Sequence, residues 1–366
     1  MRVTDTTAGT SAVQPPLFTT PEGRVDWVDV AKGVCILFVV MMHSTLGVEE
    51  LTGQPSWMGT VVAWAQPFRM PDFFFIAGLF LVRTIDAPWQ RFLDRKVVHF
   101  AYFYVLWVVI QATVKGVGDP GAIPGHIFSS LYQPFGTLWF IYMLPIFFLV
   151  VRLTKNLPVW LMLGIGAALE IAPIGTGYLL IDEFAARFVY FYAGYALAGY
   201  AFSLAERATL HPLLGFAGLL AWGVVNGLAV FTDVEVLGQT YAVAQLPFLS
   251  LALGAMGALA VIVTAALITR TVIGQGFSYM GARSIVIYLA FFFPMVVVRE
   301  LGVRSGLVPD TGTLALMTTL AAAIAPLILY WIIQKVGVGR FLFKRPAWAH
   351  IDRPTRAQRV TIAPAE

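Results

Sequence analysis

The sequence predicts an all-α protein, a polytopic membrane bundle of about ten transmembrane helices with both termini in the cytoplasm. Three observations predict this class. Of 366 residues, 58% are hydrophobic and only 12% are charged, which is too little charge to cover a soluble protein of this length. The apolar residues gather in runs of about 20, the length that crosses the hydrocarbon core of a bilayer. Lysine and arginine are concentrated in alternate loops, as in multi-pass proteins.

Ten apolar segments are predicted to span the membrane, in order along the chain. The fifth contains Glu170 and the ninth begins among glycines, so these two have the least regular pattern. The segments are 28–48, 58–82, 97–115, 136–152, 157–174, 185–204, 212–231, 246–268, 278–298 and 313–334. The loops between them are too short for a soluble domain.

The loop charges also predict the orientation and the domain limits. Cytoplasmic loops are rich in lysine and arginine, and placing the N-terminus inside puts most of these residues there. We expect a polar tail over residues 1–24, a membrane domain over 25–340 and a basic, disordered tail over 341–366 that contacts membrane lipid. Residues 1–24 lack the features of a removable signal peptide, so the first helix is expected to direct insertion.

The first span carries ionisable residues at both ends, in "VDWVDVAKGVCILFVVMMHS" (25–44). Lys32 and His43 are eleven residues apart, so they lie within roughly 20° of one another around a helix and about 16 Å apart along it. Asp29 falls on nearly the same face. Ionisable groups inside a span are costly and mark functional positions, so this stripe predicts a polar path. The alternatives are a histidine bonded to a neighbouring helix and a lysine that extends to the interface.

The second span contains "PFRMPDFFFIAGLF" (67–80). Arg69 and Asp72 are three residues apart, so they can share a helix face and form an ion pair. Pro71 removes a helical hydrogen bond, which is tolerated where the backbone lines protein or water. Gly78 permits close approach of another helix. The pattern predicts an ion pair between Arg69 and Asp72. This pair could have a functional role, or it could be a structural ion pair at a helix kink.

The loop after the second span is strongly basic. It carries Arg83, Arg91, Arg95 and Lys96. These cations could determine topology alone, or they could bind phosphate, because guanidinium groups donate paired hydrogen bonds to phosphate oxygens.

Two later spans are rich in aromatic residues, and the second of them also carries a cation. "FGTLWFIYML" places Trp139 and Tyr142 at the start of the fourth span, where an aromatic belt is also expected. "RFVYFYAGYALAGY" places Arg187 at the outer end of a helix rich in glycine and aromatic residues.

Five segments occur in an order that is typical of one family. They are "DWVDVAKGVCILFVVMMHS", "FRMPDFFFIAGLF", "LDRKVVHFAYFYVLW", "GTLWFIYML" and "RFVYFYAGYALAG". Together with the ten spans, they resemble the acyltransferase-3 family of polytopic bacterial acyltransferases over nearly the whole chain. The absence of an appended soluble domain is similar to the shorter members that modify glycans, including the fucose O-acetylase-like branch.

The resemblance implies a multi-pass enzyme of the bacterial inner membrane. Such an enzyme moves an acyl group, acetyl or succinyl, from cytoplasmic acyl-CoA to a hydroxyl of a cell-envelope glycan or lipid-linked sugar at the periplasmic side. Acyl-CoA is then the donor substrate, and no permanently bound cofactor is expected.

The family's functional residues correspond to particular positions here. Its essential histidine falls on His43, and its basic residue eleven positions earlier, often arginine, is Lys32. Its loop arginine pair matches Arg95 and either Arg91 or Lys96, with an unusual spacing. Many members carry a glutamate after the Leu-Trp motif of the fourth span, and "LWFIYMLPIFF" has none.

These correspondences suggest roles for the candidate residues. His43 is expected to act as general base on the acceptor hydroxyl or as a transient acyl carrier. Arg69 is expected to stabilise the thioester oxyanion or to orient His43, with Asp72 as its partner. The expected CoA-phosphate ligands are Lys32, Arg91, Arg95 and Lys96, and the expected acceptor contacts are Trp139, Tyr142 and Arg187.

Two other functions fit parts of the pattern. A glycan or lipid exporter, or a proton-coupled transporter, would also use a proline-broken helix and buried charges. An acyltransferase-like scaffold without activity would fit the missing glutamate. The single cysteine excludes a disulfide within the chain, the five histidines are too scattered for a metal site, and the net charge of +4 follows from topology without a nucleic-acid partner.

Overall fold

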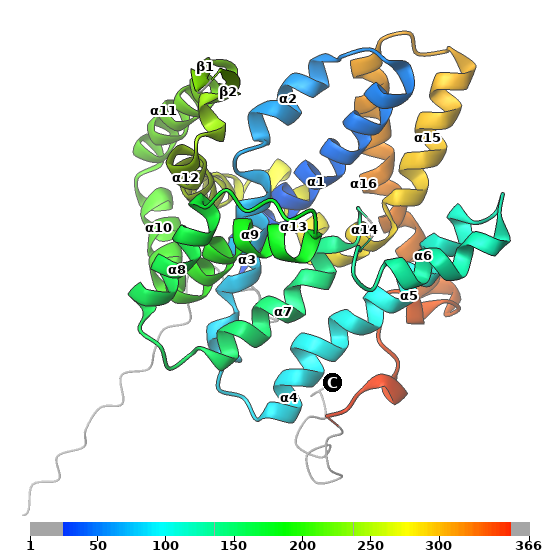
Figure 1. Cartoon of the computed structure of the whole chain (residues 1–366), viewed down its shortest axis with the longest axis horizontal. Helices are drawn as coiled ribbons and strands as arrows, with labels where there is room; N and C mark the ends of the chain where they lie inside the picture. Colours follow the sequence, from blue (N-terminus) through cyan, green and yellow to red (C-terminus); the bar gives the residue numbers. More distant parts are fainter. Residues whose placement is uncertain (1–24, 135, 237, 353–366) are drawn as a thin grey trace, which may run out of the picture.

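The computed structural model describes residues 25–352, apart from 135 and 237, and these form a helical bundle with one small hairpin (Figure 1). The predicted tail over 1–24 lies outside the described residues. The longer helices are α1 (Asp26–Thr52), α2 (Trp57–Ala65), α3 (Arg69–Leu79), α5 (His99–Lys115), α7 (Trp139–Leu153), α8 (Val159–Ile171), α9 (Leu179–Ala196), α10 (Ala198–Leu210), α11 (Pro212–Phe231), α12 (Pro247–Ile268), α13 (Val272–Ala282), α15 (Phe292–Ser305) and α16 (Thr311–Val336). The shorter ones are α4 (Trp89–Leu93), α6 (Ile123–Ser129) and α14 (Ser284–Ala290).

The described residues contain fewer long spans than the ten predicted. Five helices are long and apolar enough to cross a membrane: α1, the continuous unit Trp89–Lys115, α11, α12 and α16. Two bent pairs raise the number to seven, α9 with α10 at 73° and α14 with α15 at 51°. In the second pair Pro294 lies in the first turn of α15 and has no N–H for a helical bond to the preceding turn, which accounts for the bend. Helices α7 and α8 are apolar but shorter.

The predicted span 58–82 is broken into α2 and α3. Pro67 follows the end of α2 and cannot donate a backbone hydrogen bond, so the helix does not continue through it. Pro71 lies in the first turn of α3, where a missing N–H costs least. The proline predicted to kink one helix therefore lies at the start of a separate helix, and Arg69 becomes the first residue of α3.

The all-α prediction missed a two-stranded antiparallel hairpin. Strands β1 (Asp233–Val236) and β2 (Gln239–Ala242) pair with Asp233 opposite Ala242 and Val236 opposite Gln239. The turn uses Gly238 at a φ of +79°. The hairpin connects α11 to α12 and lies at the same end of the bundle as the α1–α2 connection (Figure 1).

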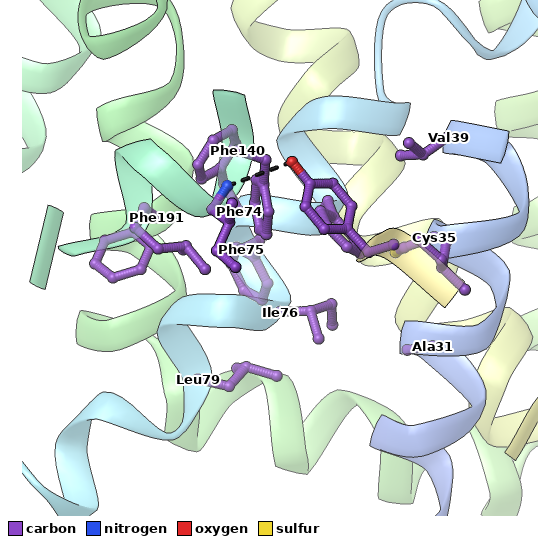
Figure 2. Close-up of a cluster of buried hydrophobic side chains, with 14 of the residues drawn as sticks. Ala31, Cys35, Val39, Phe74, Phe75, Ile76, Leu79, Phe140 and Phe191 are labelled. Carbon is purple, nitrogen blue, oxygen red and sulfur yellow. Dashed lines mark hydrogen bonds between the residues drawn. The ribbon is translucent and has the colours of Figure 1, made fainter. Parts of the chain in front are cut away.

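Helix α1 crosses the centre of the bundle and packs against α13, α16, α12 and α3. Small residues let backbones meet there: a methyl group on Gly33 would overlap the carbonyl of Phe277, and one on Gly281 would overlap the carbonyl of Asp29. Between α1 and α9, the buried face of α3 presents Phe74, Phe75, Ile76 and Leu79, with Phe191 of α9 on one side and Ala31, Cys35 and Val39 of α1 on the other (Figure 2). This packing holds α1 and α3 in a fixed relation.

Replacing Gly281 with alanine is expected to destabilise the protein by about 1–3 kcal/mol, the usual cost of overpacking a core. The new methyl group would displace the α1 backbone at Asp29. Thermal unfolding in detergent measures the effect. Gly276→Ala is the matched control, because Gly276 lies on the same helix and a methyl group there would meet no atom within 4 Å. Equal melting temperatures for the two variants would contradict the close α1–α13 contact.

The first part of the predicted C-terminal tail packs against the α4 region. The side chain of Arg345 is buried and its Nη2 lies 2.5 Å from Oδ2 of Asp94. The backbone N–H of Ile351 donates to Oδ1 of Asp94, and Arg91 Nε lies 3.3 Å from Oδ2 of Asp352. Residues 341–352 are thus folded onto the basic loop, and the remainder of the predicted tail lies outside the described residues.

Candidate functional site

His43 lies at a cavity of about 180 Å³ between α1, α3, α7, α9 and α14, which we call the His43 cavity. Its lining comprises Val39, Met42, His43, Arg69, Met70, Phe73, Thr137, Trp139, Phe140, Glu183, Arg187 and Tyr288. Four predicted site residues, from four separate helices, therefore meet in one place: His43, Arg69, Trp139 and Arg187. Asp72 and Tyr142 are not part of this lining.

The charges around the His43 cavity are close enough to act on one another. Nε of Arg187 lies 3.0 Å from Oε2 of Glu183, one helical turn earlier on α9. The positive charge of Arg187 acts on Arg69, and that of Arg69 acts on His43. The cavity therefore combines an imidazole, two guanidinium groups and a carboxylate.

Local hydrogen bonds hold the two helix starts that line the cavity. The carboxylate of Asp182 accepts from the backbone N–H of Thr176 at 2.8 Å and of Gly177 at 3.0 Å. These bonds tie the preceding turn to the first turn of α9, and Glu183 follows Asp182 directly. The hydroxyl of Thr137 donates to Oε1 of Gln111 on α5 at 3.0 Å, which fixes the turn before Trp139. The hydrogen bonds of Asp182 and of Thr137 therefore fix the positions of side chains that line the cavity.

The predicted ion pair between Arg69 and Asp72 does not form in the described structure. Nη1 of Arg69 donates to the carbonyl of Val62 on α2 at 3.3 Å, and Nε of Arg69 is buried without a hydrogen-bond partner among the described residues. Both carboxylate oxygens of Asp72 are likewise buried without a hydrogen-bond partner there. The spacing of three permits a pair on a continuous helix, but Arg69 begins α3 and its side chain reaches back toward α2.

Tyr142 makes different contacts from Trp139, although both lie on α7. Its hydroxyl donates to the carbonyl of Leu131 at 2.8 Å, and its ring packs against Tyr104. It therefore ties α7 to the segment that precedes it and to α5, whereas Trp139 reaches the His43 cavity.

Lys32 lies at a second cavity of about 190 Å³, which we call the Lys32 cavity. Its lining comprises Lys32, Phe73, Ile76, Ala77, Phe100, Phe140, Ile141, Leu144, Ser284, Ile285 and Tyr288. Nζ of Lys32 lies 3.2 Å from Oδ1 of Asp29 and 5.5 Å from the centroid of the Phe80 ring. The cavity is apolar apart from Lys32, Ser284 and the Tyr288 hydroxyl.

Of the three loop cations predicted to bind CoA, Lys96 lies within electrostatic range of Lys32. The charges of Arg95 and Lys32 both act on Lys96, whose ammonium also lies 4.5 Å from the centroid of the Phe148 ring. Arg91 instead pairs with Asp352 of the C-terminal segment. Lys32, Arg95 and Lys96 form a positive cluster at the end of α1 opposite His43.

Sequence reasoning missed Glu183, Thr137 and Tyr288 as cavity residues. The predicted span began at 185, so Glu183 was left outside the set of ionisable residues inside the membrane. The i, i+4 spacing of Glu183 and Arg187 was the available signal, because it is the spacing of helical ion pairs. Thr137 and Tyr288 carried no signal, since only tertiary packing brings them to His43.

The cavity chemistry fits proton transfer and anion stabilisation. An imidazole can take a proton from a hydroxyl, and a guanidinium can stabilise an oxyanion. A carboxylate beside an indole ring can orient a polar molecule with an apolar face. Among the described residues, no group of three or more histidine, cysteine, aspartate or glutamate side chains is arranged to hold a metal ion.

Comparison with known proteins agrees with the resemblance in the sequence. Residues 25–335 match the family described as "Acyltransferase domain". The inner membrane protein YcfT of Escherichia coli (strain K12) is 27% identical over 157 residues, covering 36% of this chain and 44% of that protein, so the match spans less than half of the relative's length. No solved structure matches significantly. The family match includes every helix from α1 to α15 and nearly all of α16, and we conclude that this multi-pass membrane protein belongs to the acyltransferase-3 family.

Proposed function

We propose that the protein is an O-acyltransferase that moves an acetyl or succinyl group from acyl-CoA to a hydroxyl of a cell-envelope carbohydrate. The observation that carries this proposal is the convergence of His43, Arg69 and Glu183 in one cavity, with Lys32 at a second cavity along the same helix. Family membership supports the reaction class, and in this proposal each of the two cavities takes one of the two substrates.

His43 performs the proton transfer in this mechanism. Its neutral imidazole takes the proton of the acceptor hydroxyl while the oxygen bonds to the thioester carbon. Arg69 stabilises the oxyanion that forms on the carbonyl oxygen, because its buried Nε–H has no hydrogen-bond partner among the described residues and can donate to the substrate. The carbon–sulfur bond then breaks, and the imidazolium returns the proton to the CoA thiolate. The products are the ester and CoA.

The acceptor binds at the charged part of the His43 cavity. Glu183 accepts hydrogen bonds from sugar hydroxyls, and Arg187 holds Glu183 in place through their 3.0 Å ion pair. The indole of Trp139 packs against the apolar face of the sugar ring. Glu183 therefore supplies an acceptor-side carboxylate in a chain that lacks the glutamate many members carry after the Leu-Trp motif.

The donor binds at the Lys32 end. Lys32, Arg95 and Lys96 neutralise the phosphates of CoA, and the arm of CoA runs along α1 toward His43, a distance of about 16 Å. The name of the relative YcfT and the distribution of loop cations support a location in the bacterial inner membrane, with Lys32 toward the cytoplasm and His43 toward the periplasm.

The test is consumption of radiolabelled acetyl-CoA by the purified protein in liposomes, with glucan oligosaccharides supplied at the other face. We expect label to leave acetyl-CoA and to appear in the oligosaccharides, and succinyl-CoA serves as the second donor. If neither donor is consumed and CoA does not bind in calorimetry, the acyltransferase proposal fails, and transport of glycans or lipids becomes the function to test.

A further inference from the structure

The Lys32 cavity and the His43 cavity share three aromatic residues. Phe73 comes from α3, Phe140 from α7 and Tyr288 from α14, and each lines both cavities. All three are buried, with 8%, 7% and 5% of their surface exposed. The same side chains therefore separate an apolar chamber from a charged one.

The three rings form one continuous contact. The centroids of Phe73 and Phe140 are 4.3 Å apart, and those of Phe140 and Tyr288 are 5.8 Å apart in an edge-to-face arrangement. The Tyr288 hydroxyl accepts a hydrogen bond from the backbone N–H of Ile141, beside Phe140, at 3.4 Å. Phe140 is the central ring, and it lies across the buried cluster from Val39 of α1 (Figure 2).

We propose that Phe73, Phe140 and Tyr288 form a gate between the two cavities, and that the Lys32 cavity is the binding chamber for the pantetheine arm of acyl-CoA. The occupant rests on the proposed function, whereas the gate rests on the geometry of the rings. The chamber suits a slender arm with a few amide groups, since its lining is mainly aliphatic and aromatic, with Lys32, Ser284 and the Tyr288 hydroxyl as its polar groups.

A closed gate affects both the stability of the thioester and the movement of ions along α1. A closed wall keeps the thioester apart from the charged His43 cavity, so that acyl-CoA is not hydrolysed when no acceptor is bound. It also interrupts the polar path along α1, which would otherwise conduct ions or protons. Phe73 and Phe140 carry no polar group, so rotation of these two rings changes side-chain packing alone and can leave the hydrogen bond between Tyr288 and Ile141 in place.

Accessibility of a cysteine in the His43 cavity tests the gate without any assay of activity. Met42 lines that cavity, so Met42→Cys is made in a Cys35→Ala background, which removes the natural cysteine. The protein is placed in liposomes, and a charged methanethiosulfonate is added from the Lys32 side. Labelling from the opposite side is measured in parallel.

Phe140→Ala is expected to raise the labelling rate from the Lys32 side by about tenfold or more, a drop in barrier of ~1.4 kcal/mol. Phe147→Ala is the matched control, because Phe147 is a fully buried ring on the same helix that lines neither cavity. Phe140→Leu replaces Phe140→Ala if the alanine variant does not fold. Equal rates with and without the Phe140 substitution would overturn the gate.

Acceptor-free hydrolysis of acetyl-CoA tests the occupant. We expect Phe140→Ala to hydrolyse acetyl-CoA about tenfold or more faster than wild type, and Phe147→Ala to match wild type once the folded fraction is counted. If labelling depends on Phe140 but the protein consumes no acyl-CoA, the gate stands, and both the acyltransferase proposal and the assignment of the Lys32 cavity to acyl-CoA fail. If acyl transfer is normal but hydrolysis does not depend on Phe140, the Lys32 cavity is not the pantetheine chamber, and the acyltransferase proposal stands.

Discussion

His43→Ala is expected to lower acyl transfer from acetyl-CoA by about 10²–10⁴-fold, the range that general acid–base catalysis contributes. The imidazole is the one side chain in the His43 cavity whose usual pKa allows it to take and return a proton near neutral pH. Replacement with alanine leaves the guanidinium groups and the carboxylate in place, so binding of both substrates is expected to change much less than the rate.

The measurement is the initial rate of transfer from radiolabelled acetyl-CoA in liposomes. His211→Ala is the matched control, because His211 is exposed beyond the end of α10 and does not line the His43 cavity. Size-exclusion profiles and melting temperatures establish that both variants fold. Activity close to wild type in folded His43→Ala would remove His43 as the catalytic group.

The same experiment separates the two routes open to His43. If His43 carries the acyl group, protein denatured rapidly at neutral pH during turnover retains label that hydroxylamine releases. If His43 acts as general base, wild type retains no such label, although its transfer rate still depends on the imidazole.

Arg345→Leu is expected to destabilise the protein by about 3–5 kcal/mol, the cost of leaving one charge of a buried pair without its partner. The side chains of Arg345 and Asp94 are 3% and 5% exposed, with 2.5 Å between Nη2 and Oδ2. Nη1 of Arg345 also donates to the backbone carbonyl of Asp94 at 2.8 Å. Loss of the guanidinium would therefore free residues 341–352 from the helix that carries Arg95 and Lys96.

Thermal unfolding in detergent measures this loss. Arg340→Leu is the matched control, because its guanidinium makes an exposed 3.4 Å hydrogen bond to the carbonyl of Gln334. The double variant Asp94→Asn with Arg345→Leu is expected to recover part of the stability, since the buried carboxylate is then neutral. Melting of Arg345→Leu at the temperature of Arg340→Leu would show that the pair contributes little to folding.

The likeness to a family was evident in the sequence, but the number of spans was not. Apolar composition identifies segments that prefer a membrane, and helices occur in all ten predicted segments. Composition does not reveal whether a segment is one straight helix. Pro67 breaks the second segment and Pro294 bends the ninth, and the 73° bend after α9 divides a stretch that reads as continuous.

Some features of the candidate site could likewise be predicted from the sequence and others could not. Spacing within one helix predicted that Lys32 and His43 share a face of α1, and in the structure each of them lines a cavity, with three aromatic residues common to both linings. Spacing also suggested the Arg69–Asp72 pair, which fails because the helix begins at Arg69 and its guanidinium turns back to Val62.

The sequence by itself determined the class of the protein, the position of His43 and Lys32 on one helix, and the basic loop after the second span. These follow from hydropathy and from the 3.6-residue helical period, which depend only on neighbouring residues. Only the tertiary structure decided that Glu183 and Arg187 line the same cavity as His43, that Phe73, Phe140 and Tyr288 line both cavities, and that Arg345 ties the C-terminal segment to Asp94. Such contacts join residues far apart in the chain, and they are set by how helices pack.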